Sequence, residues 1–253
     1  MSNMLADRPY QVIVMGAGSG IGRATAEFLA AGGAPVGCLD RDETAAAKTA
    51  HAIERAGGRA LAVAADVTRE ATLAPALDRV TEAFGPIQAL VNCAGITGRT
   101  NIKAHEVDPA DFDAVYRINL RGALLVSQAV LPGMLAQNYG RILHVASIAG
   151  KEGNAGMAAY SATKAGLIGL VKSMAKDYAE TGITINALAP AVIQTPMVDA
   201  LPQATVDYMT AKIPMRRCGT LAEVAAMIAW IVSPACSFTT GFTFDLSGGR
   251  ATY

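Results

Sequence analysis

Residues 11–32 read QVIVMGAGSGIGRATAEFLAAG, and this stretch decides the fold. An apolar run at 11–15 leads directly into glycines at positions 16, 18, 20 and 22, and a helical pattern follows. Glycine permits a tight turn and a close backbone approach, while the first N–H groups of the helix can hold a pyrophosphate. The spacing is G-x-x-x-G-x-G, because position 21 is isoleucine. The stretch therefore predicts a dinucleotide loop, with an ordinary strand-to-helix turn as the alternative.

The same alternation of strand and helix continues along the chain. Short apolar runs begin at residues 11, 35, 60, 88, 141, 183 and 242, and helical patterns cover 20–32, 43–57, 69–84, 109–138, 156–180 and 221–232. Strands that alternate with helices predict a parallel sheet covered on both faces. We expect one α/β domain over 1–253, a doubly wound Rossmann fold with seven parallel strands. Residues 195–219 interrupt the pattern, which favours a substrate lid over a structural excursion.

Composition excludes several classes of partner. Lys and Arg together number 21, as do Asp and Glu, so no net field attracts nucleic acid or an anionic membrane. Two uncharged runs, Thr181–Val198 and Val224–Phe244, are broken by prolines and small polar residues, which indicates core segments rather than membrane spans. Four cysteines without a C-x-x-C pair predict free thiols and no metal site. The opening MSNMLADRPYQ lacks a signal-peptide pattern, so we expect a cytoplasmic protein.

Asp40 ends the second predicted strand, about twenty residues after the glycine loop. A carboxylate there can accept hydrogen bonds from the adenosine ribose of NAD and would repel the 2′-phosphate of NADP. Arg41 follows and could instead meet that phosphate, and Asp40 could simply cap the next helix. The pattern favours NAD over NADP.

Tyr160 and Lys164 lie four residues apart in MAAYSATKAG, so a helix would place both on one face. A tyrosine with a pKa of about 10 is a poor base at neutral pH, but a nearby ammonium favours the phenolate. Moving this pKa to about 7 requires about 4 kcal/mol of differential stabilisation, part of which an oxidised nicotinamide could supply. The pair therefore predicts a general acid/base.

Taken together, these motifs resemble the short-chain dehydrogenase/reductase family over almost the full length of the chain. Residues 15–22 are similar to its TGxxxGIG loop, with Met15 in place of threonine, and residues 92–95, NCAG, match its NAG element. Asp66 and Val67 match the pair that contacts adenine. The Pro-Gly that follows the sixth strand in the family is Pro190-Ala191 here.

The resemblance implies a catalytic tetrad and a set of cofactor contacts. The tetrad falls on Asn119, Ser147, Tyr160 and Lys164. Ser147 would bind the substrate oxygen, Tyr160 would exchange the proton, Lys164 would also bind the nicotinamide ribose, and Asn119 would hold a water that relays the proton to solvent. The cofactor-binding residues are expected to be Gly16, Ser19, Gly20, Ile21, Gly22, Asp40, Arg41, Asp66, Val67, Asn92, Ala94, Gly95, Tyr160, Lys164, Pro190, Ile193, Thr195 and Met197.

The segment between Ser147 and Tyr160 is expected to border a small-molecule substrate. Lys151 could pair with a carboxylate and Asn154 with hydroxyl groups, or both could belong to a solvated loop. This segment resembles bacterial dehydrogenases of sugars and 2-keto-3-deoxy acids, which implies NAD-linked oxidation of a polyol or sugar acid. It also resembles 3-oxoacyl-carrier-protein reductases, so NADPH-linked ketone reduction is the alternative. A cofactor-binding scaffold without turnover is a third hypothesis.

The resemblance also implies a homotetramer. One two-fold would pair the helices at 109–138 and 156–180, and another would pair the last strands. Arg250 or Tyr253 could then reach the active site of another subunit.

Overall fold

The computed structural model describes residues 10–200, 202–251 and 253, without the side chains of Pro196 and Met197. Seven strands form one parallel sheet in the order β3-β2-β1-β4-β5-β6-β7. They are β1 Gln11–Met15, β2 Val36–Asp40, β3 Ala60–Ala64, β4 Ile87–Asn92, β5 Gly140–Val145, β6 Ile183–Pro190 and β7 Thr243–Leu246. The predicted doubly wound α/β fold is confirmed.

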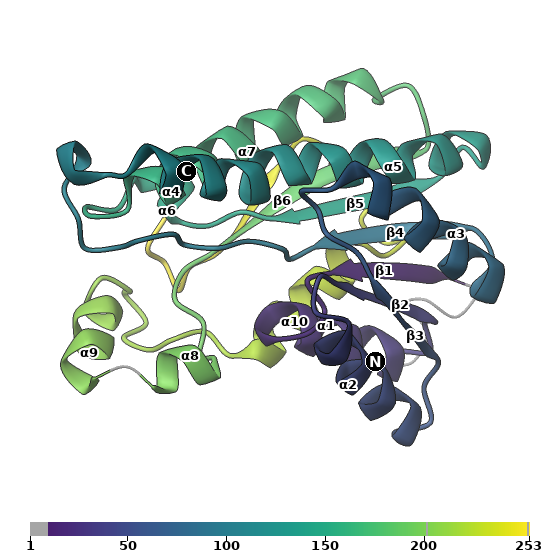
Figure 1. Ribbon diagram of the computed structural model, residues 1–253, viewed down its shortest axis with the longest axis horizontal. Helices are drawn as coiled ribbons and strands as arrows, with labels where there is room; N and C mark the ends of the chain where they lie inside the picture. The colour runs from purple at the N-terminus through teal and green to yellow at the C-terminus, as the bar shows by residue number, and fades with distance from the viewer. Residues whose placement is uncertain (1–9, 201, 252) are drawn as a thin grey trace.

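Helices cover both faces of this sheet (Figure 1). They are α1 Gly20–Ala31, α2 Glu43–Arg55, α3 Leu73–Phe84, α4 Pro109–Tyr116, α5 Gly122–Ala136, α6 Ala149–Glu152, α7 Ala158–Asp177, α8 Pro196–Asp199, α9 Gln203–Ala211 and α10 Leu221–Ile231. One core lies under α1, α2 and α10, and the other lies under α3, α5 and α7. Because both faces of the sheet are buried, its central strands are apolar throughout rather than alternating.

The order of the strands reverses between β1 and β4. From β1 the chain continues to β2 and β3 on one side, and from β4 it continues to β5, β6 and β7 on the other. In an open parallel sheet this switch point leaves a crevice at the carboxyl ends of the strands, where ligands bind. The loops after β1, β2, β4, β5 and β6 all emerge at that edge. The fold therefore brings the glycine loop, Asp40, the NAG element and Ser147 to one end of the sheet.

The helical stretch expected at 109–138 is not one regular helix. A π turn over Arg117–Arg121 separates α4 from α5 and contains Asn119. The run Pro109–Ala136 is long and apolar enough to cross a membrane, but half of its most apolar window is buried inside the fold. Val126 and Val130 of α5 belong to the core beneath the sheet. Packing within the domain therefore accounts for the apolar character of this run.

The segment 195–219, expected as a lid, carries the two short helices α8 and α9 (Figure 1, green). None of the described side chains of α9 is buried. The two ends of the segment meet in a single parallel bridge between Ile193 and Gly219. Gly219 N–H donates to Val192 O at 2.9 Å, and Gln194 N–H donates to Gly219 O at 2.8 Å. The base of the segment is thus closed while its helices project from the body.

Candidate active site

The glycine loop after β1 has no room for side chains at Gly16 or Gly22, where the neighbouring atoms belong to the backbone. Gly16 has a φ of +80°, and a Cβ atom there would lie 2.9 Å from the backbone nitrogen of Ala94. A Cβ atom on Gly22 would lie 2.0 Å from the carbonyl oxygen of Gly16. The first loop therefore closes tightly on itself and on the NAG element, as a pyrophosphate cradle requires.

The start of α1 completes this cradle. Ser19 is the N-cap residue, and within the described residues its side chain makes no capping hydrogen bond to the first turn. The first N–H groups of the helix are thus left to another acceptor, and the helix dipole favours a negative charge there. Shape and donors at this loop fit a dinucleotide.

Asp40 is held at the end of β2 by two backbone donors. Its Oδ2 accepts from Gly18 N–H at 2.9 Å and its Oδ1 from Asp42 N–H at 3.0 Å. A carboxylate oxygen can accept more than one hydrogen bond, so each oxygen keeps capacity for a ribose hydroxyl. Asp40 does not cap the next helix, as the alternative had it. Asp42 is the N-cap residue, and its side chain accepts from Ala45 N–H at the start of α2. Arg41 is exposed beside this carboxylate.

Asp66 and Val67, expected near the adenine, follow β3. Asp66 Oδ1 accepts from both the N–H and the hydroxyl of Thr68 at 2.8 Å, which fixes the turn. Val67 is buried and packs against α5, where a Cβ atom on Gly122 would lie 2.8 Å from Val67 Cγ2. These contacts shape the wall of the crevice beside β3.

The NAG element is fixed by Asn92 at the end of β4. Its Oδ1 accepts from Ala94 N–H at 3.2 Å, and its Nδ2 lies 3.1 Å from Nδ1 of His144. An amide nitrogen only donates, so His144 Nδ1 accepts and its Nε2 carries the hydrogen. That Nε2–H donates to Ser127 Oγ at 2.9 Å, whose own hydrogen goes to Ala123 O. The imidazole thus joins β4, β5 and α5.

His144 was not predicted as a site residue. It is fully buried, and burial together with the charge of Lys164 lowers its pKa to about 3. It is therefore a neutral link at physiological pH rather than a proton carrier. A histidine among the apolar residues 142–146 was the one signal that could have revealed it.

The four tetrad residues converge beside the NAG element. Lys164 is buried, and its Nζ donates to Val145 O at 2.6 Å. A Cβ atom on Gly95 would lie 3.4 Å from Lys164 Nζ and 3.2 Å from Asn119 Oδ1, so Gly95 keeps the space between them open. Ser147 Oγ accepts from Ala149 N–H at 3.1 Å, which leaves the hydroxyl hydrogen for another partner.

Asn119 links the NAG loop to α7. Its Oδ1 accepts from Ile96 N–H and its Nδ2 donates to Ile96 O, both at 2.9 Å. The same Nδ2 lies 3.2 Å from Thr163 Oγ1. Both amide hydrogens are used, so a relay water could meet this side chain only at the remaining lone pair of Oδ1.

Burial and a hydrogen bond, rather than the charge of Lys164, determine the pKa of Tyr160 in the structure. Burial raises the pKa of Tyr160, and a hydrogen bond with Ser147 offsets this only in part. The Lys164 ammonium lies 5.7 Å from the centre of the tyrosine ring and is directed to Val145 O. Burial lowers the pKa of Lys164 to about 8, so this cation is itself destabilised. The surroundings of Tyr160 in the structure therefore raise its pKa rather than lower it.

The two expected substrate contacts already have partners within the chain. Lys151 Nζ forms an ion pair with Asp245 Oδ2 at 2.9 Å, and Asn154 Oδ1 accepts from Arg250 at 2.9 Å. The side chain of Lys151 is only 9% exposed. The expectation of a free ammonium for a substrate carboxylate therefore differs from the structure, because Asp245 neutralises it.

The residues after β6 that were expected to contact the cofactor follow the carboxyl end of that strand. Pro190 ends β6 and accepts from Ile148 N–H at 3.0 Å, while Ile193 is buried in the bridge to Gly219. Thr195 Oγ1 accepts from Val198 N–H at the start of α8. The side chain of Met197 lies outside the described residues.

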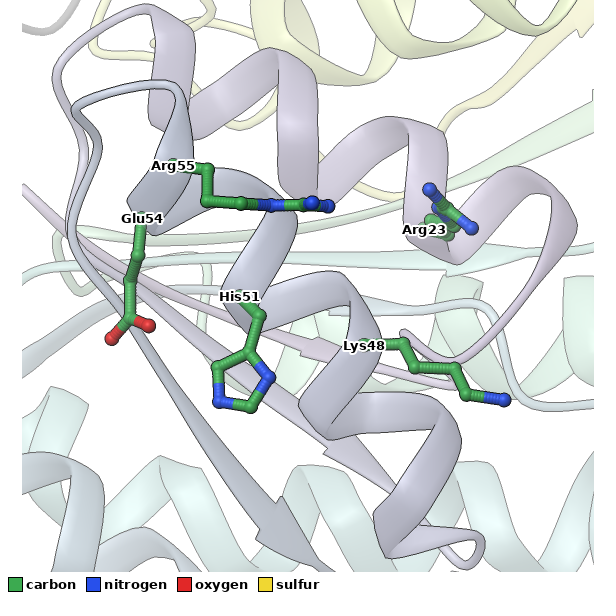
Figure 2. A pocket seen from close by; sticks show the side chains of 5 residues that line it. All are labelled: Arg23, Lys48, His51, Glu54 and Arg55. Carbon is green, nitrogen blue, oxygen red and sulfur yellow. The ribbon is translucent and has the colours of Figure 1, made fainter.

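A separate hollow of about 780 Å³ lies between α1 and α2, lined by Arg23, Lys48, His51, Glu54 and Arg55. Figure 2 shows these side chains on the outer sides of the two helices, with none from the tetrad among them. Arg23 is paired with Glu27 of its own helix. The hollow is an open surface feature and takes no part in the site described above. Within the described residues, no group of three His, Cys, Asp or Glu side chains could hold a metal ion.

Comparison with known proteins agrees with this geometry. Residues 16–251 match the family model described as enoyl-(acyl carrier protein) reductase. The 2-dehydro-3-deoxy-L-rhamnonate dehydrogenase (NAD(+)) of a Sphingomonas species is 44% identical over 95% of each chain. The cis-4-hydroxycyclohexanecarboxylate dehydrogenase of Sinomonas cyclohexanicum is 41% identical over 94% of each chain.

Reductases are similar as well. The 3-oxoacyl-[acyl-carrier-protein] reductase of Vibrio cholerae is 37% identical over 94% of this chain and 95% of its own length. The crystal structure of gox2181 superimposes with a TM-score of 0.93 at 33% identity, covering 98% of this chain and 97% of the other. With the glycine loop, the NAG element and the tetrad assembled at one edge of a parallel sheet, the chain belongs to the short-chain dehydrogenase/reductase family.

Proposed function

We propose that this protein oxidises a secondary alcohol of a small sugar acid of the 2-keto-3-deoxy type, with NAD as hydride acceptor. The observation that carries the reaction class is the hydrogen bond between Ser147 and Tyr160, next to a buried Lys164 of the same helix α7. The substrate class is supported by the relative from Sphingomonas, whose name gives both a 2-dehydro-3-deoxy sugar acid and NAD.

The chain's own residues account for binding and proton transfer. The Ser147 hydroxyl, which accepts from Ala149 N–H, donates to the substrate oxygen and orients the reacting carbon. Tyr160 removes the hydroxyl proton as the carbonyl forms and returns it in the reverse direction. Oxidised nicotinamide, when bound, would supply the hydride acceptor and a positive charge in addition to that of Lys164. Lys164 remains fixed on Val145 O, so the cation does not have to move during the reaction.

Asp40 supports the choice of NAD. Its carboxylate is oriented by Gly18 and Asp42 at the point where the adenosine ribose would lie. Two unit charges about 5 Å apart at an effective dielectric constant of about 20 repel by about 3 kcal/mol, and a 2′-phosphate carries more than one charge. Exposed Arg41 offsets part of this repulsion. We therefore expect the protein to prefer NAD over NADP rather than to exclude NADP completely.

The second candidate is reduction of a 3-oxoacyl thioester with NADPH. The relative from Vibrio cholerae and the description of the matching family model favour it. Asp40 opposes it, because thioester reduction of this kind would require the 2′-phosphate to lie beside a fixed carboxylate. The two candidates therefore differ in cofactor as well as in substrate.

We also propose a cytoplasmic homotetramer. Exposed aromatic side chains lie on both surfaces expected to pair: Phe112 and Tyr116 on α4, and Trp230 and Phe242 beside β7. All four cysteines in the described chain are free thiols, as a reducing compartment would keep them. The segment 195–219 is proposed as the substrate lid, because it follows β6 at the ligand-binding edge and its helices project from the body.

The deciding experiment follows nicotinamide absorbance at 340 nm. The wild-type protein is supplied with NAD or NADP and 2-dehydro-3-deoxy-L-rhamnonate, related sugar acids and polyols, and in reverse with acetoacetyl thioester and NADH or NADPH. We expect NAD-linked oxidation of a sugar acid, and an Asp40→Ser variant that gains at least about tenfold in its relative use of NADP. Thioester reduction with NADPH by the wild-type protein would overturn both the substrate and the role of Asp40.

A further inference from the structure

The short helix α6 connects the two catalytic side chains that act on substrate. It begins two residues after Ser147, and a Cβ atom on Gly150 would lie 2.6 Å from the backbone carbon of Lys164 in α7. The loop that follows is tied to α7 as well, because Asn154 N–H donates to Ser161 Oγ at 3.0 Å. A displacement of α6 would therefore move both Ser147 and the start of α7.

The last residues of the chain hold α6 from outside. We call residues 247–251 with Tyr253 the tail; in Figure 1 the chain ends beside α6. Gly248 and Gly249 both have positive φ, and Ala251 N–H donates to Ser247 Oγ at 3.1 Å, which turns the tail back across the protein. Only glycine adopts two such conformations in succession without strain.

Arg250 makes the central contact of the tail. Its Nε donates to Glu152 Oε2 at 2.9 Å, a terminal nitrogen lies 2.8 Å from the same oxygen, and that nitrogen also donates to Asn154 Oδ1 at 2.9 Å. The arginine side chain is 9% exposed and that of Glu152 is 26% exposed. The planar guanidinium thus spans the end of α6 and the loop after it, which the single charge of a lysine could not do.

Two further contacts hold the same turn. The Tyr253 hydroxyl donates to Lys151 O at 2.7 Å, and Lys151 Nζ lies 4.9 Å from the centre of the Tyr253 ring. The same ammonium pairs with Asp245 at the end of β7. The Lys151 ammonium, the Lys151 carbonyl and the Glu152 carboxylate are thus all bound by residues about 90 or more positions later in the chain.

The tail also contacts the end of the segment 195–219. Met215 N–H donates to Gly248 O at 3.1 Å, and a Cβ atom on Gly248 would lie 2.7 Å from Ile213 Cγ2. The tail thus lies between the proposed lid and α6, the two walls that would border the substrate.

We propose that Arg250 is a positioning residue for the oxidation assigned above, and that it acts within its own subunit by fixing α6 and Asn154 against the catalytic helix. The inference rests on the proposed function for its kinetic readout. It replaces the expectation that Arg250 reaches a neighbouring active site, because its guanidinium is committed to Glu152 and Asn154 of the same chain.

The first test compares Arg250→Ala with Arg250→Lys and with a control, Arg55→Ala. Arg55 is an exposed arginine of α2, and its replacement by alanine removes the same positive charge. We expect kcat/KM for the sugar acid to fall about tenfold or more in Arg250→Ala, because loss of alignment near a reacting centre is costly. Arg250→Lys should recover part of the loss, and Arg55→Ala should match the wild-type protein. The dissociation constant for NADH should stay within about twofold, since the tail does not touch the cradle. Unchanged kcat/KM, or an equal loss of NADH binding, would overturn the proposal.

The second test does not depend on turnover. Hydrogen exchange of peptides that cover residues 148–157 should become at least about tenfold faster in Arg250→Ala, while peptides from β1 and β4 keep wild-type rates. If the wild-type protein oxidises no sugar acid, the proposed substrate fails while this result still decides whether Arg250 holds α6. Wild-type exchange in the variant would refute the positioning role.

The third test separates action within a subunit from action between subunits. Arg250→Ala and Tyr160→Phe chains are co-expressed so that mixed oligomers form. If Arg250 acts within its own chain, no mixed oligomer contains an intact site, and activity stays at the level of the Arg250→Ala subunits present. Activity above that level would show that Arg250 serves a neighbour and would overturn the proposal.

Discussion

Replacing Gly22 by alanine should open the glycine loop after β1. The added methyl group would lie 2.0 Å from the carbonyl oxygen of Gly16 and 2.7 Å from its carbonyl carbon. Real Cβ atoms do not approach backbone atoms that closely, so α1 and the loop must separate by about 1 Å. The contact involves only main-chain atoms, so no flexible side chain can rotate away. The φ of Gly22 is not positive, which leaves the steric overlap as the single cause.

The expected cost follows from this overlap. Forcing a methyl group into a packed site costs about 1–3 kcal/mol of unfolding free energy, against a helix-propensity gain of about 1 kcal/mol for Gly→Ala. Gly133 of α5 provides the matched control, because a Cβ atom there meets nothing within 4 Å. Gly133→Ala should therefore stabilise the protein by up to about 1 kcal/mol. The same chemical change has opposite signs at the two positions.

Two measurements check this prediction. Urea unfolding followed by circular dichroism gives the free energies, and titration with NADH followed by fluorescence gives the dissociation constant. Gly22→Ala should weaken NADH binding by about a hundredfold, because the donors of the cradle are displaced by about 1 Å. A Gly22→Ala protein that binds NADH within about threefold of the wild-type value would refute the view that the loop and α1 hold the dinucleotide.

Three further outcomes are expected. Tyr160→Phe should abolish turnover and retain NADH binding, measured by the 340 nm assay and by titration; a scaffold without turnover would lose nothing. His144→Asn should destabilise the protein most at pH 7.5 and about 2.7 kcal/mol less at pH 4.5, measured by urea unfolding. The reason is that the unfolded histidine binds a proton below about pH 6.5, whereas the buried one stays neutral down to about pH 3. A cost independent of pH would exclude a buried neutral imidazole. Lys164→Met should inactivate the protein yet raise its unfolding free energy at pH 7, and this gain should shrink as the pH rises from about 8 towards 10.5, where the wild-type lysine loses its proton first in the folded state. A gain that does not change between pH 7 and pH 10 would contradict the lowered lysine pKa.

The strands were predictable because helices cover both faces of the sheet, so that most strand residues are apolar. The runs at 11 and 60 begin and end where β1 and β3 do, and that at 35 begins one residue before β2. Local pattern is sufficient there, since every residue of a central parallel strand meets apolar neighbours. The glycine loop was recognisable from its local spacing, and the tetrad was expected from the resemblance to the family; the roles of these residues remain predictions.

Features that depend on distant partners were not predictable. The π turn at Asn119 looks like regular helix in the sequence, and the local pattern does not reveal that the Asn119 amide pairs with Ile96, 23 residues earlier. In the sequence Lys151 looks like a free cation, because its ion-pair partner Asp245 lies 94 residues later. Apolar periodicity reports which face of an element is buried, but it does not report which polar groups meet across the fold.

The bridge between Ile193 and Gly219 affects how well the protein tolerates insertions and deletions during evolution. Because the two ends of the intervening segment are already joined, altering its length adds little loop-closure entropy, about 0.6 kcal/mol for each doubling. None of the described side chains of α9 is buried, so few core contacts would be lost with it. Helix α9 can therefore vary in sequence and length at little cost in stability, whereas Thr195, Ile213 and Met215 in the same stretch contact the rest of the fold. If the segment is the proposed lid, substitutions in α9 are where a new substrate preference could arise with the fewest losses elsewhere.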